Sequence, residues 1–147
     1  MKVLVLHGVN LNMFGKRDPK QYGTATLDEI NNRLMALGRE LGVEVIAFQT
    51  NFEGEMCERI HAAHAEGVDA VVINPGAWTH YSYAIHDALE ILTAPVIEVH
   101  MSDIHAREAF RRVSVVAPVA HQTIMGLGVE SYLQGLRAAV EAAKKPG

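Results

Sequence analysis

Short, almost uninterrupted apolar runs alternate along the chain with longer segments in which apolar residues recur every three or four positions. Continuous runs are typical of strands buried on both faces, whereas the longer spacing is typical of amphipathic helices. The pattern therefore predicts five strands, at residues 2–7, 43–48, 69–73, 96–100 and 113–116.

The clearest predicted helix carries one apolar stripe, made of Leu27, Ile30, Leu34, Leu37 and Leu41. Thr26 and Glu29 have the spacing of a capping box at its start, and Gly42 is a typical stop signal at its end. Similar stripes predict helices from about residue 53 to Gly67, over 85–92 and over 133–143, with a shorter helix near 106–111.

Strands that alternate with helices favour a parallel sheet covered by helices on both faces. Five strands fit an α/β fold of the flavodoxin-like, doubly wound kind, in a single domain over residues 1–147. Ligands of such sheets bind beyond the carboxyl ends of the strands, so site residues are expected in the loops there. The last residues, 144–147, are expected to fray.

The composition is that of an ordinary globular domain, with 49% hydrophobic and 20% charged residues among 147. A net charge of -4 argues against a nucleic-acid partner. The single cysteine, Cys57, cannot form an internal disulfide, and the first apolar run is too short for a signal peptide. We therefore expect a cytoplasmic protein, and no stretch is apolar enough to predict a membrane span.

The loop after the first predicted strand, residues 8–23, is sixteen residues long. Connections between a strand and a helix usually have about 2–6 residues, so this loop suggests a lid with glycines at its ends as hinges. It carries Asn10, Arg17 and Tyr22. A floppy insertion without function is the alternative.

Glu98 and His100 lie two residues apart in the fourth predicted strand, so their side chains point to the same face. A buried carboxylate needs a partner, and it can orient the imidazole. The pair is interpreted either as a catalytic acid or base or as a structural contact at the edge of the sheet. The polar turn at residues 74–80 follows the third predicted strand and leads into a helix.

Several common sites do not fit the sequence. Gly8 and Gly15 enclose six residues, whereas a phosphate-binding P-loop has four between its glycines. Residues 126–128 form a lone GxG without the third glycine of a dinucleotide-binding motif. His61 and His64 lie three apart on a predicted helix, but no carboxylate cluster joins them, so we interpret them as solvated residues rather than metal ligands.

Four motifs follow one another at the predicted loops: Asn10-Leu11-Asn12 with Arg17 and Tyr22, Gln49-Thr50-Asn51-Phe52-Glu53-Gly54, Asn74-Pro75-Gly76-Ala77 with Thr79-His80, and Glu98-Val99-His100-Met101-Ser102. Together with Ala106-Arg107-Glu108, Phe110-Arg111 and Gly126-Leu127-Gly128, they resemble type II 3-dehydroquinate dehydratase over nearly the whole chain. The resemblance implies a hydro-lyase that converts 3-dehydroquinate to 3-dehydroshikimate in the shikimate pathway or in quinate catabolism. It implies an anti elimination through an enol or enolate, with no metal and no organic cofactor.

The resemblance also implies catalytic roles for five residues. Tyr22 would be the base that removes the proton α to the ketone, and Arg17 would stabilise the tyrosinate. Asn10 would hold a water against the developing enolate oxygen. His100 would protonate the departing hydroxyl as the general acid, with Glu98 orienting its ring.

The implied substrate contacts complete the expected site. Ser102 and the backbone amide of Met101 would bind the substrate carboxylate. The ring hydroxyls would be held by Asn74, His80 and Arg111. Asp87 would reach into the site of a neighbouring subunit, because the family forms trimers that assemble into a dodecamer.

The chain differs from the family pattern at a few positions near these residues. His7 and Val9 stand in the family's usual Asn-Gly-Pro-Asn opening, Asp103 replaces an Asn, and His86 replaces an Arg. None of these changes removes a proposed catalytic group. Two alternatives remain: a paralogue that acts on a related polyhydroxy cyclic acid, and a flavodoxin-like module that binds an anion or a flavin phosphate without turnover.

Overall fold

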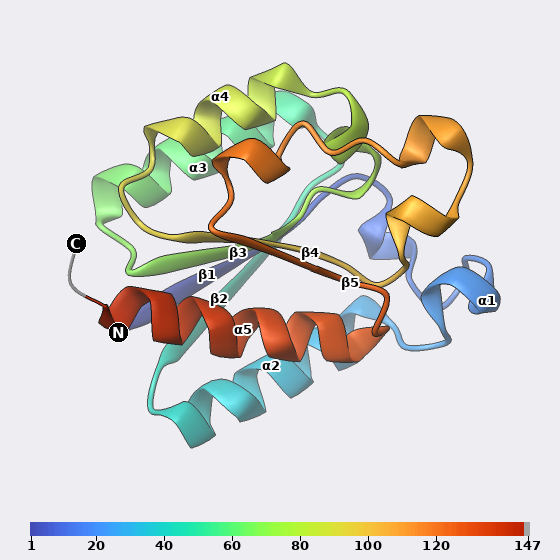
Figure 1. The fold of residues 1–147 in the computed structure, drawn as a ribbon. Coiled ribbons are helices and arrows are strands. Elements are labelled where there is room, and N and C mark those ends of the chain that lie inside the picture. Colours follow the sequence, from blue (N-terminus) through green and yellow to red (C-terminus); the bar gives the residue numbers. More distant parts are fainter. Residues whose placement is uncertain (146–147) are drawn as a thin grey trace.

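Five parallel strands form the centre of the fold (Figure 1). The computed structural model describes residues 1–145. The strands are β1 (Lys2–His7), β2 (Glu44–Gln49), β3 (Ala70–Asn74), β4 (Val96–His100) and β5 (Gln122–Met125). Their order in the sheet is β2-β1-β3-β4-β5, which is the flavodoxin-like arrangement that the sequence predicts.

Two helices cover each face of the sheet (Figure 1). They are α2 (Leu27–Leu41) and α5 (Val129–Lys144) on one face, and α3 (Glu53–Glu66) and α4 (Tyr83–Ile91) on the other. No helix among residues 1–145 is long and apolar enough to cross a membrane. This arrangement buries both faces of the sheet, which explains why its strands read as continuous apolar runs.

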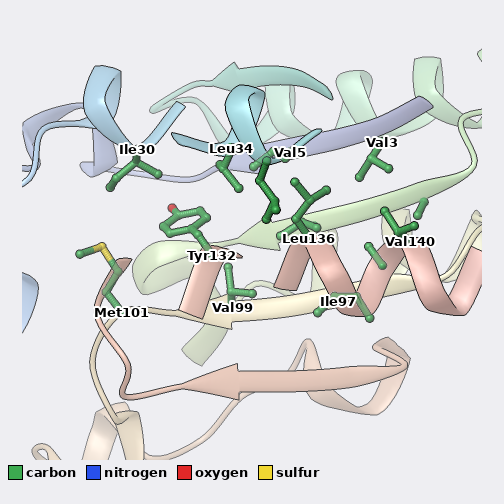
Figure 2. Packing of buried hydrophobic residues seen from close by; sticks show 14 of the residues in the cluster. Val3, Val5, Ile30, Leu34, Ile97, Val99, Met101, Tyr132, Leu136 and Val140 are labelled. Atoms are coloured by element: carbon green, nitrogen blue, oxygen red, sulfur yellow. The ribbon is translucent and has the colours of Figure 1, made fainter. Parts of the chain in front are cut away.

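Alternate side chains of β1 enter two separate cores. Val3 and Val5 pack against α2 and α5 (Figure 2), while Leu4 and Leu6 pack against α3 and α4. All four side chains are fully buried. Burial of such a side chain contributes about 1.5–3 kcal/mol, so the two cores together provide the main stabilisation of the sheet.

Helix α2 begins and ends where the sequence predicts. The Thr26 hydroxyl accepts a hydrogen bond of 3.2 Å from the Glu29 amide, and Gly42 follows the helix with a φ of 71°. This left-handed conformation carries little steric penalty for glycine, so the chain can turn there into β2. The predicted helix from about residue 53 to Gly67 is confirmed as α3.

The fifth predicted strand, residues 113–116, is wrong. Val113 is 57% exposed, and the Ser114 hydroxyl binds Glu98 and the amides of Val116 and Ala117. The β-branched residues of this segment follow strand periodicity, but its backbone pairs with no strand. The edge strand is β5, which pairs with β4 alone and contains only two apolar residues.

The predicted helix near 106–111 is also wrong. Two 3-10 turns, Ile104–Ala106 and Ala109–Arg111, take its place because the backbones of Arg107 and Glu108 are extended. At the C-terminus, α5 includes Lys144, which the sequence predicts to fray. Residues 146–147 of that predicted tail lie outside the described residues.

A close approach at the carboxyl edge of the sheet brings two loops together. The Gly8 amide donates a hydrogen bond of 2.8 Å to the Asn74 carbonyl, and a Cβ on Gly8 would lie 2.2 Å from the Pro75 carbonyl oxygen. Only glycine fits there, because a larger residue would separate the loops. The segment that carries Arg17 and Tyr22 therefore begins next to the end of β3.

Candidate active site

A cavity lies where the loops after β1, β3 and β4 meet. Eight of the eleven predicted site residues line it: Arg17, Tyr22, Asn74, His80, His100, Met101, Ser102 and Arg111. Glu98 does not line the cavity itself but binds His100, which does. The predicted loops therefore converge on one site at the carboxyl edge of the sheet, as expected for this fold.

Tyr22 is the last residue of the short helix α1 (Pro19–Tyr22), whose first turn is capped by the Asp18 carboxylate. Its hydroxyl accepts hydrogen bonds from Arg17 Nη2 at 2.9 Å and from Arg107 Nη1 at 2.6 Å. The Arg17 guanidinium also lies over the phenol ring, with Cζ 3.9 Å from the ring centroid. Two guanidinium groups therefore place hydrogen-bond donors and positive charge at this one oxygen.

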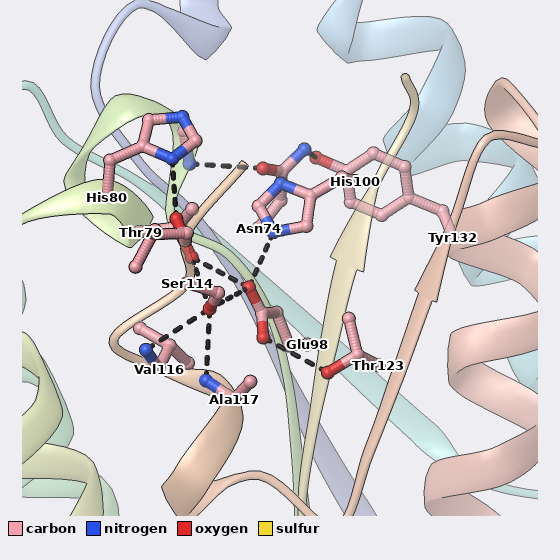
Figure 3. A network of polar contacts seen from close by, with 12 residues as sticks. Asn74, Thr79, His80, Glu98, His100, Ser114, Val116, Ala117, Thr123 and Tyr132 are labelled. Carbon is pink, nitrogen blue, oxygen red and sulfur yellow. Dashed lines mark hydrogen bonds and ion pairs between the residues drawn. The ribbon is translucent and has the colours of Figure 1, made fainter. Parts of the chain in front are cut away.

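Glu98 is fully buried on β4 and receives four side-chain donors (Figure 3). His100 Nε2 lies 2.6 Å from Glu98 Oε2, and the hydroxyls of Thr79 and Ser114 donate to the same oxygen at 2.7 and 2.8 Å. The Thr123 hydroxyl donates to Oε1 at 3.1 Å. A buried carboxylate is tolerated here because both oxygens are hydrogen-bonded.

The surroundings keep Glu98 ionised. Burial alone would raise the pKa of Glu98, but the hydrogen bond and charge of His100, with the hydroxyls of Thr79 and Ser114, lower it below the usual value. A carboxylate only accepts hydrogen bonds, so His100 Nε2 carries the proton that points to Glu98. His100 Nδ1 is then left to exchange a proton with a molecule in the cavity.

His80, at the end of the turn after β3, also lines the cavity. Its Nδ1 lies 2.8 Å from the Val113 carbonyl oxygen and must donate to it. Burial lowers the pKa of His80, and the charges of His100, Arg111 and Arg107 act in the same direction, although the Val113 bond opposes them. The neutral ring therefore offers Nε2 to the cavity as an acceptor.

The wall formed after β4 is rich in donors. Met101 and Ser102 are 4% and 8% exposed, and Arg107 Nη1 reaches the Ser102 hydroxyl at 3.4 Å. Arg111 binds Glu108 through Nε at 2.7 Å, which leaves its Nη groups for other partners. Guanidinium and hydroxyl donors on one wall suit a carboxylate ligand.

Asn74 is held from two sides (Figure 3). Its Oδ1 accepts a hydrogen bond of 3.1 Å from the Gly76 amide, and its Nδ2 donates to the Tyr132 hydroxyl at 3.1 Å. Tyr132 in turn lies 2.9 Å from Nδ1 of His7. The amide of Asn74 is therefore oriented before any ligand arrives.

Two predicted site residues do not reach the cavity. Asn10 is exposed with a left-handed backbone (φ 67°), and its amide donates to Asn51 Oδ1 at 2.8 Å. Asp87 is exposed on α4, where its carboxylate lies 2.9 Å from Nδ1 of His86. Their proposed roles in the reaction stay predictions.

Sequence reasoning missed several residues of the site. Arg107 was visible only as part of a motif, and its contact with Tyr22 joins positions 85 residues apart. Thr79, Ser114 and Thr123 had one indirect signal, because a buried Glu98 requires donors. No local pattern pointed to them as those donors.

Within residues 1–145, no three His, Cys, Asp or Glu side chains are grouped so that they could hold a metal ion. His61 and His64 are exposed on α3, in agreement with their interpretation as solvated residues.

Comparison with known proteins gives one consistent result. Residues 1–140 match the family described as dehydroquinase class II. The 3-dehydroquinate dehydratase of Leptothrix cholodnii is 67% identical over 140 residues, which are 95% of this chain and 94% of that protein. The type II dehydroquinase structure from Butyrivibrio crossotus has a TM-score of 0.93 at 40% identity, covering 95% of this chain and 97% of that one. The type II dehydroquinase structure from Propionibacterium acnes has a TM-score of 0.90 at 47% identity, covering 98% and 97%.

Proposed function

The chain belongs to the class II dehydroquinases, enzymes that dehydrate 3-dehydroquinate in the shikimate pathway, and on that premise we propose which of its residues carry the reaction. One observation supports the proposal above all others. A phenol bound by two guanidinium groups and an imidazole bound by a buried carboxylate line the same cavity. Such a cavity holds a base and an acid for one elimination.

Tyr22 is the base. A phenol ordinarily keeps its proton at neutral pH, so it needs help to act as an anion. Arg17 and Arg107 provide this help through their hydrogen bonds to its oxygen. The tyrosinate takes the proton from the carbon α to the ketone, and the electron pair of that C–H bond forms the enolate. Asn10 holds a water molecule that stabilises the negative charge of this enolate.

His100 is the acid that completes the elimination. The enolate expels the hydroxyl on the neighbouring carbon, which takes a proton from His100 Nδ1 and leaves as water. The Glu98 carboxylate on Nε2 stabilises the imidazolium that donates this proton. Return of the proton from Tyr22 to His100, through solvent, readies the enzyme for the next molecule.

The remaining contacts position the substrate. Ser102 and the Met101 amide bind its carboxylate, next to Arg107. The ring hydroxyls are bound by Asn74, which offers a donor, by His80, which offers an acceptor, and by Arg111. This division suits hydroxyl groups, because each of them donates one hydrogen bond and accepts others.

Residues 8–23 act as a lid that carries the base. Arg17 and Tyr22 both lie in this segment, so closing it brings the base to the substrate and excludes water from the arginine–phenol contacts. The first residue of the segment, Gly8, lies against the backbone of Pro75. We expect the segment beyond that anchor to move as the substrate enters.

The active assembly is a homo-oligomer, a dodecamer of four trimers, in which Asp87 of one subunit reaches the site of the next. Three features of α4 support this proposal. Asp87 is exposed and lies outside its own cavity, and Tyr83 and Ile91 on the same helix are 71% and 52% exposed. Large exposed apolar side chains around a charged one are typical of subunit interfaces. The cytoplasmic location predicted from the sequence stays a prediction.

The test is an ultraviolet assay with purified protein and 3-dehydroquinate. Wild type should produce the absorbance of the conjugated enone of 3-dehydroshikimate, with the same rate in the presence of a metal chelator. Tyr22→Phe should remain folded and lose about 10²–10⁴-fold in kcat, the usual contribution of a general base. A flat trace from folded wild type, or full activity in Tyr22→Phe, would contradict the proposal.

A further inference from the structure

Behind Asn74, a row of polar side chains runs from the cavity into the core. It passes from Asn74 to Tyr132 of α5, from Tyr132 to His7 of β1, and from His7 to Asn31 of α2. Asn74, Tyr132 and His7 are at most 3% exposed. Four elements, β3, α5, β1 and α2, therefore contribute one continuous set of hydrogen bonds that ends at the cavity.

The direction of these hydrogen bonds follows from His7. Its Nε2 lies 2.8 Å from Asn31 Oδ1, an acceptor, so Nε2 carries a proton. Burial lowers the pKa of His7 to about 4, although the Asn31 bond opposes this, so the ring is neutral at pH 7 and its Nδ1 has a free lone pair. The Tyr132 hydroxyl must donate to that lone pair across 2.9 Å.

This direction determines what Tyr132 can offer to Asn74. With its only proton given to His7, the Tyr132 oxygen accepts, and Asn74 Nδ2 donates to it at 3.1 Å. On the other side, the Gly76 amide donates to Asn74 Oδ1. Rotation of the Asn74 amide by half a turn would place its NH2 group against the Gly76 amide, donor against donor, and its oxygen against the Tyr132 oxygen, acceptor against acceptor. The second N–H of Nδ2 has no acceptor among residues 1–145.

We propose that His7 and Tyr132 are positioning residues that hold Asn74 as a hydrogen-bond donor towards the substrate, so that the ligand atom at this point is an oxygen acceptor. The inference rests on the proposed role of Asn74 as a substrate contact. It adds that the polarity of this contact is set from inside the core, by an acceptor on β1. Neither His7 nor Tyr132 touches the substrate.

Two pairs of variants test this proposal. Tyr132→Phe removes one oxygen and leaves the ring, whereas Asn74→Ala removes the substrate contact itself. His7→Leu removes the acceptor for Tyr132, whereas His7→Asn restores one, because Asn Oδ1 stands where His Nδ1 does. Val140→Ala is the control for lost stability, since Val140 is buried on α5 without a polar contact.

The expected result is a change in KM rather than in kcat. Tyr132→Phe and His7→Leu should raise KM for 3-dehydroquinate by about three- to tenfold, the usual worth of one hydrogen bond. Their kcat should stay within about twofold of wild type, because Asn74 binds the ground state and the transition state alike. His7→Asn should have nearly the KM of wild type, and Val140→Ala should melt at a lower temperature with KM unchanged.

Other outcomes distinguish failure of the positioning role of His7 and Tyr132 from failure of Asn74 as a substrate contact. If Asn74→Ala raises KM but Tyr132→Phe does not, the positioning role is wrong and the proposed function stands. If Asn74→Ala leaves KM unchanged, Asn74 is no substrate contact and its place in the proposed function is wrong. A rise in KM for Val140→Ala, or an equal rise for His7→Asn and His7→Leu, would assign the effect to lost packing and overturn the inference. Tyr132→Phe keeps the test decisive should His7→Leu fail to fold.

Discussion

Arg107 donates a hydrogen bond of 2.6 Å to the hydroxyl of Tyr22, which is 85 residues away in the sequence. Arg17, five residues from Tyr22, binds the same oxygen at 2.9 Å. The extended backbone of Arg107, between two 3-10 turns, allows this reach. Residues 8–23 and the segment after β4 are therefore joined at the oxygen that we propose as the base.

Loss of either arginine should slow the reaction. Arg17→Leu and Arg107→Leu are each expected to lower kcat by about 10- to 100-fold, since a hydrogen bond to a charged group contributes about 1.5–3 kcal/mol. Steady-state kinetics with 3-dehydroquinate measure this effect. Arg59→Leu is the matched control, because Arg59 pairs with Glu66 on α3. Full kcat in Arg107→Leu would show that Arg17 alone activates Tyr22.

The charge of Glu98 should matter more than any one of its hydroxyl donors. Glu98→Gln keeps the shape of the side chain but removes the charge that supports His100 as the acid in the proposed reaction, so kcat is expected to fall by about 10- to 100-fold. Thr123→Val removes only the 3.1 Å bond to Oε1 and should stay within about threefold of wild type. Kinetics and melting curves of both variants decide this. Equal kcat in Glu98→Gln and wild type would reduce the pair to a structural contact.

His7 should make the fold sensitive to mild acid. Its pKa in the folded protein is about 4 against an ordinary 6.5, so the unfolded chain binds the proton more readily. This contribution to stability is complete above about pH 6.5 and is lost as the pH falls towards about 4. Between pH 7 and about pH 4.5, wild type should lose about 2–3 kcal/mol more in its free energy of unfolding than His7→Asn.

Urea unfolding at the two pH values measures this difference. His64→Asn is the control, because His64 is exposed on α3. A parallel loss of stability would contradict this prediction. If wild type and His7→Asn lose stability in parallel, the folded protein binds a proton on His7 as readily as the unfolded chain does, and burial does not keep the ring neutral.

Sites shared between subunits can be detected by mixing two inactive variants. Asp87→Ala and Tyr22→Phe should each be nearly inactive. Unfolded together in equal amounts and refolded, they should regain about a quarter of wild-type activity, because about one site in four then combines an intact Tyr22 with an intact Asp87 from the next subunit. Light scattering confirms the assembly. Mixtures without activity, in oligomers of the expected size, would confine Asp87 to its own subunit.

The parts of the site that the sequence predicts are those governed by local periodicity. Glu98 and His100 share a face because a strand repeats every two residues, and the structure confirms their contact at 2.6 Å. Arg17 and Tyr22 could be associated because they lie five residues apart in one loop. The strands β1 and β4 have the predicted bounds, since both are buried on both faces and read as apolar without interruption.

The errors arise where tertiary contacts override local pattern. Residues 113–116 have strand-like composition, but they pair with no strand, and the Ser114 hydroxyl donates a hydrogen bond to Glu98. The true edge strand, Gln122–Met125, has too few apolar residues to be recognised. The contacts of Arg107 and Tyr132 cross 85 and 58 residues, and no local spacing indicates contacts between residues so distant.

The hydrogen bond between His7 and Tyr132 joins the first strand to the last helix across 125 residues. On the ribosome, Tyr132 is synthesised 125 residues after His7. Their hydrogen bond can therefore form only when the C-terminal part of the chain has left the exit tunnel. All five strands precede Tyr132 in the chain and can already pair before that moment. The hydrogen bonds of Tyr132 with Asn74 and His7 cannot form before then, so the proposed substrate contact at Asn74 is completed only in the final stage of synthesis.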